Sequence, residues 1–355
     1  MGATAFIMAG FAGIPYFNIM IAAIMPALLY YFGVFLYVIL AAKRLNIKSV
    51  LKPINTRELL LDAPLFFIPL AVLVYFLFNG YSLPYVGFWS IISVVVLGLL
   101  SNVRKDINLT WRTVLKDMIG GVRVGSEMAV VCALIAIIAT CIKVSGLGIR
   151  LPIVINDISG GHLIAALFIA LFASTLLGMG VPTPVAYILV AIGVVPALES
   201  MGVSLIQAHF FCFISAVFSH ITPPIAVGAL IASRIAIAQF WPTCWEAVKA
   251  GITAFLLPFF VIYVPMIVLR PGEDLLFQST QIMAIVCGLF SLQVFLSNSC
   301  FSFLKVHERV IFLISALCSL VFIFVQTYYF FLTGTILLAI GLVRQFMARG
   351  VPAPD

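Results

Sequence analysis

The chain has 355 residues, of which 64% are hydrophobic and 9% are charged, and its mean hydropathy is +1.25. Soluble domains carry about 25% charged residues, so this composition excludes them and indicates an integral membrane protein. The formal net charge of +7 comes from basic residues concentrated in a few loops, and no basic face interleaved with aromatics predicts a nucleic-acid partner. The seven cysteines have no paired spacing, which predicts neither a disulfide framework nor a zinc site.

Apolar segments long enough to cross a bilayer recur along the whole chain. In chain order, the predicted spans are 18–42, 63–79, 85–100, 126–144, a broken helix at 163–198, 251–269, 281–297, 310–325 and 328–343. The loops 43–57 and 104–123 are rich in lysine and arginine, so both are expected to face the cytoplasm. Residues 147–161, with few charges, are expected to form an external loop. Residues 1–14 lack a basic leading segment and do not predict a signal peptide.

The stretch GMGVPTP, from Gly178 to Pro184, interrupts the apolar segment 163–198. Glycine leaves the backbone unshielded and each proline removes a helical hydrogen-bond donor, so a helix cannot pass through this stretch intact. Unsatisfied backbone groups at membrane depth are tolerated only where they line a cavity or bind something. A structural kink rarely needs two glycines and two prolines so close together, so we interpret this interruption as part of a binding site.

A second interruption, SHITPP at residues 219–224, lies between the apolar arms 208–218 and 225–232. Each arm is shorter than the roughly 20 residues that a membrane crossing needs. We therefore predict that residues 208–233 form a re-entrant hairpin with a polar tip. The next residues, 234–249, include two tryptophans and predict an amphipathic arm at the cytoplasmic surface.

A weak internal repeat relates residues 2–44 to residues 229–270. Each copy has a short apolar segment, a proline, a long span and a terminal arginine. The charge pattern places Arg44 inside and Arg270 outside, so the copies would be inverted relative to each other, as in alternating-access transporters. The predicted parts are the end of a first repeat (1–44), spans and basic loops of a scaffold (45–125), the second repeat (126–270) and a C-terminal transmembrane tail (271–355).

The two interrupted segments closely resemble the large, DctM-like membrane subunit of tripartite ATP-independent periplasmic (TRAP) transporters, especially the fused permeases of the TAXI type. The matching stretches are GMGVPTPVAYILVAIGVVPALESMGV and HFFCFISAVFSHITPPIAVGALIASRIA. The opening GATAFIMAGFAGIPY resembles the segment that comes after the first hairpin tip in that family. The resemblance extends from Gly2 to about Leu269, so it implies that this chain is the C-terminal portion of such a permease with an additional, unmatched tail.

The resemblance implies an all-α, inverted-repeat, elevator-type secondary transporter, in which a mobile core with hairpins and broken helices moves against a scaffold. It implies a multi-pass protein of the cell inner membrane, driven by a cation gradient, that transports a small, dicarboxylate-like organic acid. The implied partners are an extracytoplasmic substrate-binding protein, a small membrane subunit and an N-terminal permease half. No cofactor is implied.

The resemblance also assigns residues to the site by position. Those that would contact cation or substrate are Gly178, Gly180, Thr183, Ser219, His220 and Thr222, and those that would shape the interruptions are Pro182, Pro184, Pro223 and Pro224. A transported sodium ion would be held at Gly178, Thr183, Ser219 and Thr222. No resident metal and no catalytic residue are expected, so the chain is not predicted to be an enzyme.

Two departures from the family pattern leave alternatives open. His220 stands where an acidic residue is expected in the tip, so the coupling ion is either sodium or a proton. The first hairpin tip and everything before it are missing, so the alternatives include an inactive or split permease fragment, as well as a dicarboxylate carrier that needs no binding protein. A further alternative is a membrane-embedded enzyme that uses His220 as a base. The sequence gives it little support, because it contains no nucleophile and no set of metal ligands at suitable spacing. His209 begins an arm and is expected at the membrane interface.

Overall fold

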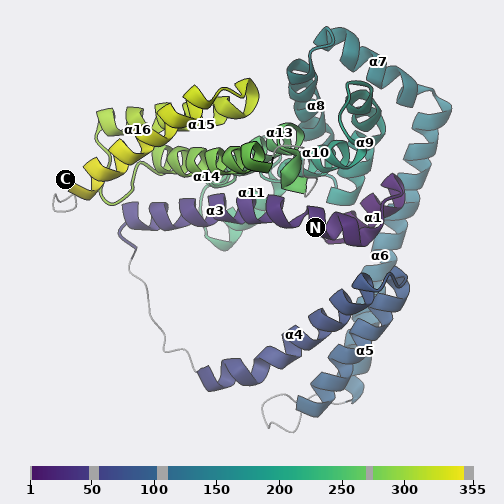
Figure 1. Cartoon of the computed structure of the whole chain (residues 1–355). Coiled ribbons are helices and arrows are strands. Elements are labelled where there is room, and N and C mark those ends of the chain that lie inside the picture. Colours follow the sequence, from purple (N-terminus) through teal and green to yellow (C-terminus); the bar gives the residue numbers. More distant parts are fainter. Residues whose placement is uncertain (1, 48–55, 102–110, 269–274, 348–355) are drawn as a thin grey trace. The chain divides into compact units, whose positions relative to one another are not determined.

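The computed structural model of the chain describes residues 2–47, 56–101, 111–268 and 275–347. Every regular element in these residues is a helix, apart from one isolated bridge. The helices are α1 (Gly2–Ala12), α2 (Tyr16–Ala22), α3 (Ile24–Arg44), α4 (Thr56–Phe78), α5 (Leu83–Ser101), α6 (Trp111–Val144), α7 (Leu147–Ser159), α8 (Leu163–Gly178), α9 (Thr183–Ser200), α10 (Leu205–Phe218), α11 (Val227–Ile235), α12 (Phe240–Ala250), α13 (Ile252–Tyr263), the 3-10 helix η1 (Pro265–Val268), α14 (Leu275–Ser297), α15 (Val306–Val325) and α16 (Tyr328–Met347) (Figure 1).

Among the described residues, six helical stretches are long and apolar enough to cross a membrane. They are Tyr16–Arg44, Thr183–Ser200, Phe240–Tyr263, Leu275–Ser297, Val306–Val325 and Tyr328–Met347. Four shorter apolar helices accompany them: Ala63–Phe78, Pro84–Leu99, Leu163–Gly178 and Leu205–Phe218. The prediction of an all-α, multi-pass membrane protein is therefore confirmed.

Two predicted loops prove to be helical. Residues 147–159, expected as an external loop, form α7, which ends at Gly160 in the left-handed conformation (φ 59°). Residues 111–123 of the predicted basic loop 104–123 belong to α6. The reason is the same in both cases, because an expected position outside the membrane does not prevent a segment from forming helical backbone hydrogen bonds. Arg104 and Lys105 lie outside the described residues.

Two compact units are present, and each is described by itself. The first contains residues 1–14, 19–48 and 138–355, and the second contains residues 15–18 and 49–137. In the second unit, α4 and α5 pack along each other. Aromatic rings gather at their uncharged turn, where the Phe76 ring lies 5.3 Å from the ring of Tyr81 and 5.3 Å from that of Tyr85. Helices α8 to α16 all belong to the first unit.

The core of the first unit is the bundle of α8, α9 and α10, each of which packs against the other two. Helix α1 packs on α9 and α10, α7 packs on α8 and α9, and α13 packs on α10. The largest side chains enclosed here include Tyr187, Phe210, Phe211 and Phe260, all less than 2% exposed. This bundle fixes the position of both interrupted segments.

The packing of the two interrupted segments differs from the prediction. The side-by-side packing expected of hairpin arms is found for α8 and α9, which were predicted to be halves of one broken helix. Among the described helices, α10 and α11 do not pack along each other, and α11 packs on α12 instead. The physical reason lies in the links: α9 reverses onto α8 after a short link that contains a glycine with positive φ, whereas the longer link after α10 leads α11 away.

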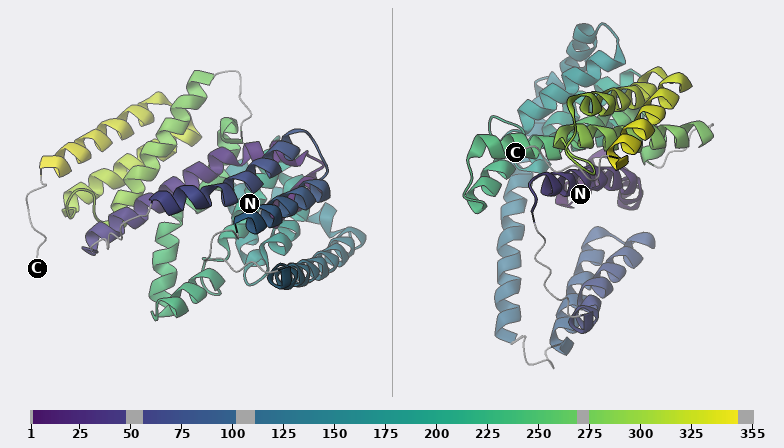
Figure 2. Two further views of the ribbon diagram at one scale, coloured as in Figure 1. Left: turned by 90° about the horizontal axis from the view of Figure 1, so that it is seen from below. Right: turned by 90° about the vertical axis from the view of Figure 1, so that its left-hand side faces the viewer.

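The C-terminal helices form a second bundle within the first unit. Helix α15 packs against both α14 and α16, and α14 also packs on α3 (Figures 1 and 2). Hydrogen bonds through Ser315 connect all three helices. Its Oγ lies 3.0 Å from Ser291 Oγ of α14 and donates to the carbonyl of Gly334 of α16 at 2.8 Å. Small residues and interhelical hydrogen bonds of this kind hold helices together where lipid removes the hydrophobic driving force.

The ends of α3 and α14 lie together. Arg44 donates a hydrogen bond to the carbonyl of Ser297 at 3.4 Å, and Lys43 donates to the carbonyl of Cys300 at 3.3 Å. The basic residues that end α3 and the loop between α14 and α15 are therefore on one side. Since the basic loop 43–57 is expected in the cytoplasm, we expect the loop between α14 and α15 there as well.

We predict that single cysteines at Asn46 and His307 are protected from an impermeant thiol reagent in intact cells, whereas a cysteine at Thr327 is labelled. The reason is that the first two positions flank basic residues and Thr327 lies at the uncharged opposite end of α15. The seven native cysteines are replaced beforehand, and permeabilised cells, in which all three positions react, give the control. Labelling of positions 46 and 307 but not 327 would show that the chain has the opposite orientation in the membrane.

We predict that Gly334→Ala destabilises the C-terminal bundle by about 1–3 kcal/mol, the usual cost of overpacking. A Cβ at this position would overlap Ser319 Oγ and would lie 3.0 Å from the backbone nitrogen of Ser319. Thermal unfolding of the detergent-solubilised protein, followed by tryptophan fluorescence, measures the effect. Gly87→Ala is the matched control, because its Cβ would meet nothing within 4 Å. Equal melting temperatures for the two variants would refute the close contact.

Candidate functional site

The first link of the site connects α8 to α9. Helix α8 ends at Gly178, after which Met179 is extended (φ −66°, ψ 120°) and Gly180 adopts φ +76°, a left-handed conformation that costs glycine little. Pro182 is also extended (φ −56°, ψ 142°), and the first turn of α9 contains Pro184. Proline suits a first helical turn because its missing N–H would have no partner there. The predicted interruption is therefore present at the predicted residues.

The second link connects α10 to α11. Its turns are closed by backbone hydrogen bonds, since the carbonyl of His220 accepts from Gly228 at 2.9 Å and the carbonyl of Thr222 accepts from Ala226 at 3.1 Å. Ala226, directly before α11, has φ +39°. The peptide bond between Pro223 and Pro224 is cis. The link is thus a folded turn rather than an open loop.

The two links lie against each other, although they are about 40 residues apart in the sequence. A Cβ added to Gly178 would lie 2.5 Å from Ser219 Oγ, 2.8 Å from Ser219 Cβ and 3.3 Å from the carbonyl oxygen of Ala216. A Cβ added to Gly180 would lie 3.4 Å from Ile225 Cδ1. Only glycine at position 178 allows this approach, so the contact explains why a glycine stands there.

Helix ends of both polarities meet at this junction. Helices α8 and α10 end there with their C-terminal carbonyls, whereas α9 and α11 begin there with their N-terminal N–H groups. Some of these groups bond within the links, such as the carbonyl of Ala216 and the N–H of Gly228, so the helix ends act here through their dipoles. Carbonyls at helix C-termini attract cations, and helix N-termini attract anions. The junction can therefore bind a cation and a carboxylate close together, as broken helices of transporters do.

The hydroxyl groups of the junction donate their protons to the backbone. Ser219 Oγ donates to the carbonyl of Ala216 at 2.6 Å, and Thr222 Oγ1 donates to the carbonyl of Ser219 at 3.0 Å. Both side chains are buried. A hydroxyl that donates its proton to the backbone can still accept from, or coordinate, a second partner. Thr183 is the first residue of α9, at the same junction.

His220 is half-buried at the second link. Its Nδ1 lies 3.2 Å from the carbonyl of Val217 and 3.4 Å from Ser219 Oγ. A carbonyl can only accept, so the bond to Val217 places the proton on Nδ1. His220 is therefore held by the backbone beside the junction.

Among the described residues, no group of three histidine, cysteine, aspartate or glutamate side chains is placed to hold a metal ion. His209 lies in the second turn of α10, and His220 lies two residues after the end of this helix.

The sequence reasoning missed the surroundings of His209. It was expected at the membrane interface but is 2% exposed, with Nδ1 2.7 Å from the hydroxyl of the fully buried Tyr187. The Phe11 ring stands edge-on to the imidazole, with ring centroids 6.0 Å apart. That prediction is wrong, because α1 and α9 cover this end of α10. The available signal in the sequence was that apolar residues lie on every side of α10, which is typical of a buried helix.

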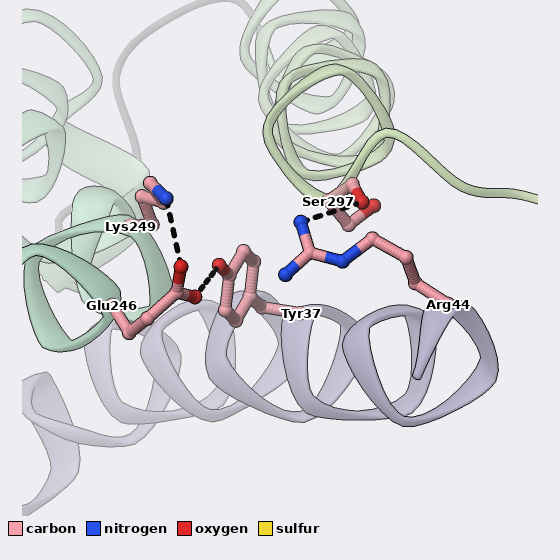
Figure 3. A network of polar contacts seen from close by, with 5 residues as sticks. All are labelled: Tyr37, Arg44, Glu246, Lys249 and Ser297. Atoms are coloured by element: carbon pink, nitrogen blue, oxygen red, sulfur yellow. Dashed lines mark hydrogen bonds and ion pairs between the residues drawn. The ribbon is translucent and has the colours of Figure 1, made fainter. Parts of the chain in front are cut away.

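A second polar network, also missed, joins α3, α12 and α14 (Figure 3). The hydroxyl of Tyr37 donates to Glu246, whose carboxylate also pairs with Lys249 at 2.8 Å. Arg44, on the same helix as Tyr37, reaches the carbonyl of Ser297. The network fastens the amphipathic helix α12 to the long span α3.

A helical bundle with six candidate spans and two interrupted segments that meet inside it defines a multi-pass membrane protein of the transporter type. The sequence matches the family described as "Tripartite ATP-independent periplasmic transporter, DctM component" over residues 1–271. The chain belongs to this family and is a membrane permease component of the inner membrane. Comparison with curated proteins and with solved structures gave no match. Helices α14 to α16 lie beyond the matched residues.

We predict that Gly178→Ala lowers the melting temperature and abolishes uptake, because its Cβ would overlap Ser219. The expected destabilisation is about 1–3 kcal/mol. Thermal unfolding and uptake in proteoliposomes are measured together. Gly10→Ala, at an open position of α1, is the control.

The double variant Gly178→Ala/Ser219→Gly separates packing from ligand binding. It removes the overlap, so the melting temperature is expected to recover, but uptake stays low because the Ser219 hydroxyl is gone. Recovery of both would show that Ser219 is not a ligand, and an unchanged melting temperature for Gly178→Ala alone would contradict the contact itself.

Proposed function

We propose that the chain forms the substrate and ion pathway of a carrier that moves small organic acids across the inner membrane, powered by a cation gradient and supplied by an extracytoplasmic binding protein. Gly178, Gly180, Thr183, Ser219, His220 and Thr222 form its binding site. The supporting observation is the meeting of the two interrupted segments, with helix ends of opposite polarity in one place.

The substrate class follows from the chemistry of the junction. The N-termini of α9 and α11 favour a carboxylate, and the C-termini of α8 and α10 favour a monovalent cation. A cation bound beside a carboxylate lowers the cost of dehydrating both. The proposal therefore couples an organic acid to sodium or to a proton, and the family supports the binding-protein partner.

The order of helices supports an inverted repeat and alternating access. In α1–α2–α3 and again in α11–α12–α13, a short helix is followed by a link, a second short helix, a one-residue interruption at Ala23 or Gly251, and a third helix. Two copies in opposite orientation give a carrier two equivalent ways to open. We propose an elevator movement of the α8–α10 core, with α3 as part of the scaffold.

The test is uptake of radiolabelled C4 and C5 organic acids into proteoliposomes that contain the complete permease, with and without its binding protein. We expect uptake that requires both the binding protein and an imposed ion gradient. Ser219→Ala and Thr222→Val should each reduce it without changing assembly. Equal uptake without the binding protein would favour a carrier that works alone, and unimpaired uptake by both variants would contradict the site.

We predict that uptake depends less on sodium than it would with the acidic residue expected at position 220. The reason is that His220 replaces the negative charge of a carboxylate with a neutral or cationic imidazole. Initial uptake is compared under a sodium gradient alone and a pH gradient alone, for the wild type and His220→Asn. Uptake that follows the pH gradient and is lost in His220→Asn supports proton coupling. Uptake that requires sodium, ignores the pH gradient and survives in His220→Asn would rule that out.

A further inference from the structure

The end of the C-terminal bundle where α15 begins and α16 ends carries a group of exposed basic side chains. Lys305 and Arg309 lie at the start of α15 and Arg344 lies in the last turn of α16. Lys43, at the end of α3, contacts the loop that leads into α15. We call these four residues the basic rim. Three of them lie beyond the residues that match the family.

A buried hydrogen-bond network holds the start of α15 against the end of α16. Glu308 Oε2 accepts from the backbone N–H of Lys305 at 2.9 Å and from Gln345 Nε2 at 2.8 Å. Because Glu308 and Gln345 directly adjoin Arg309 and Arg344, this bond holds together the two helix ends that carry these cations.

Aromatic rings fix two more members of the rim. The guanidinium of Arg309 lies over the Phe295 ring at 4.8 Å, and the ammonium of Lys43 lies over the Phe301 ring at 5.5 Å. Lys43 also donates to the carbonyl of Cys300 at 3.3 Å. A cation above an aromatic face is stabilised without losing its charge. The rim is therefore an ordered positive surface.

The basic rim has no counter-charge in its own bundle. Glu308 is the only acidic side chain in the described residues 275–347, it is 4% exposed, and its bonds are to Lys305 N–H and Gln345. No ion pair joins Lys305, Arg309 or Arg344 to a carboxylate of the part of the chain that the structure describes. Unpaired cations held together attract an anion from outside.

Exposed apolar side chains alternate with these cations. Phe303 is 40% exposed, Val306 82%, Phe346 60% and Met347 80%. A free phosphate or a nucleic acid would leave them in contact with water. A phospholipid satisfies both features, because its headgroup meets the cations and its acyl chains cover the apolar side chains.

We infer that the basic rim binds the headgroup of an anionic phospholipid in the cytoplasmic leaflet. The lipid would join the ends of α3, α15 and α16 at the membrane surface, next to the polar contacts that hold α14 on α3. This site is separate from the transport junction, so it stands whether or not the proposed substrate is correct.

The test is native mass spectrometry of the complete detergent-purified permease, titrated with phosphatidylglycerol or, separately, phosphatidylcholine. The variant Lys305→Gln/Arg344→Gln removes two rim charges that no ring contact holds. The control Arg150→Gln/Arg234→Gln removes two exposed charges from α7 and α11. Melting temperatures in lipid-free detergent check that both variants fold.

We expect the wild type and the control to retain phosphatidylglycerol in preference to phosphatidylcholine, and the rim variant to bind it about tenfold or more weakly. Addition of inorganic phosphate should not displace the lipid. Equal phosphatidylglycerol binding by all three proteins would overturn the inference. Displacement by inorganic phosphate, or binding of phosphate alone, would identify a soluble-anion site and would equally overturn the commitment to a lipid.

Discussion

The close approach of Gly178 to Ser219 is the contact on which the proposed transport site depends. Inside a membrane there is no water to satisfy the backbone groups that an interrupted helix releases. Here two interruptions supply those groups to one junction, and the absence of a side chain at position 178 lets the two backbones come within reach. The α8–α10 bundle then holds the junction in place, because each of its three helices packs on the other two. The binding chemistry that we propose is thus a consequence of how the helices end.

Sequence reasoning located the interruptions because glycine and proline act on their own backbone. The end of α8 at Gly178 and the end of α10 at Phe218 could be read directly from residue types. The residue types do not reveal which arms lie side by side, because the packing of α8 on α9 and of α11 on α12 depends on surfaces that only the fold brings together. The same limit explains His209, whose burial results from α1 and α9, and α7, whose residues were expected to form an external loop with few charges.

The first unit uses polar contacts for two different purposes. Around Tyr37 and Glu246, and along the serines of α14 and α15, they fasten helices that lipid alone would not hold together. At the junction, the hydroxyls of Ser219 and Thr222 donate to backbone carbonyls, which leaves each oxygen able to accept from, or coordinate, a further partner. The polar contacts between helices thus stabilise the packing of the first unit, whereas those of the junction belong to the α8–α10 core, which we propose binds the substrate and moves.

The most direct measurement of the central claim is thiol cross-linking between Gly180→Cys and Ile225→Cys, in a protein from which the native cysteines have been removed. The account predicts that a short bifunctional reagent links the two positions in membranes, and that the coupling ion together with an organic acid slows the reaction. Leu40→Cys/Val294→Cys, a pair from one packed cluster away from the junction, should cross-link at a rate that ignores these ligands. Failure of the first pair to react while the second reacts would contradict the meeting of the links, and a rate unaffected by every candidate ion and acid would contradict their role in binding.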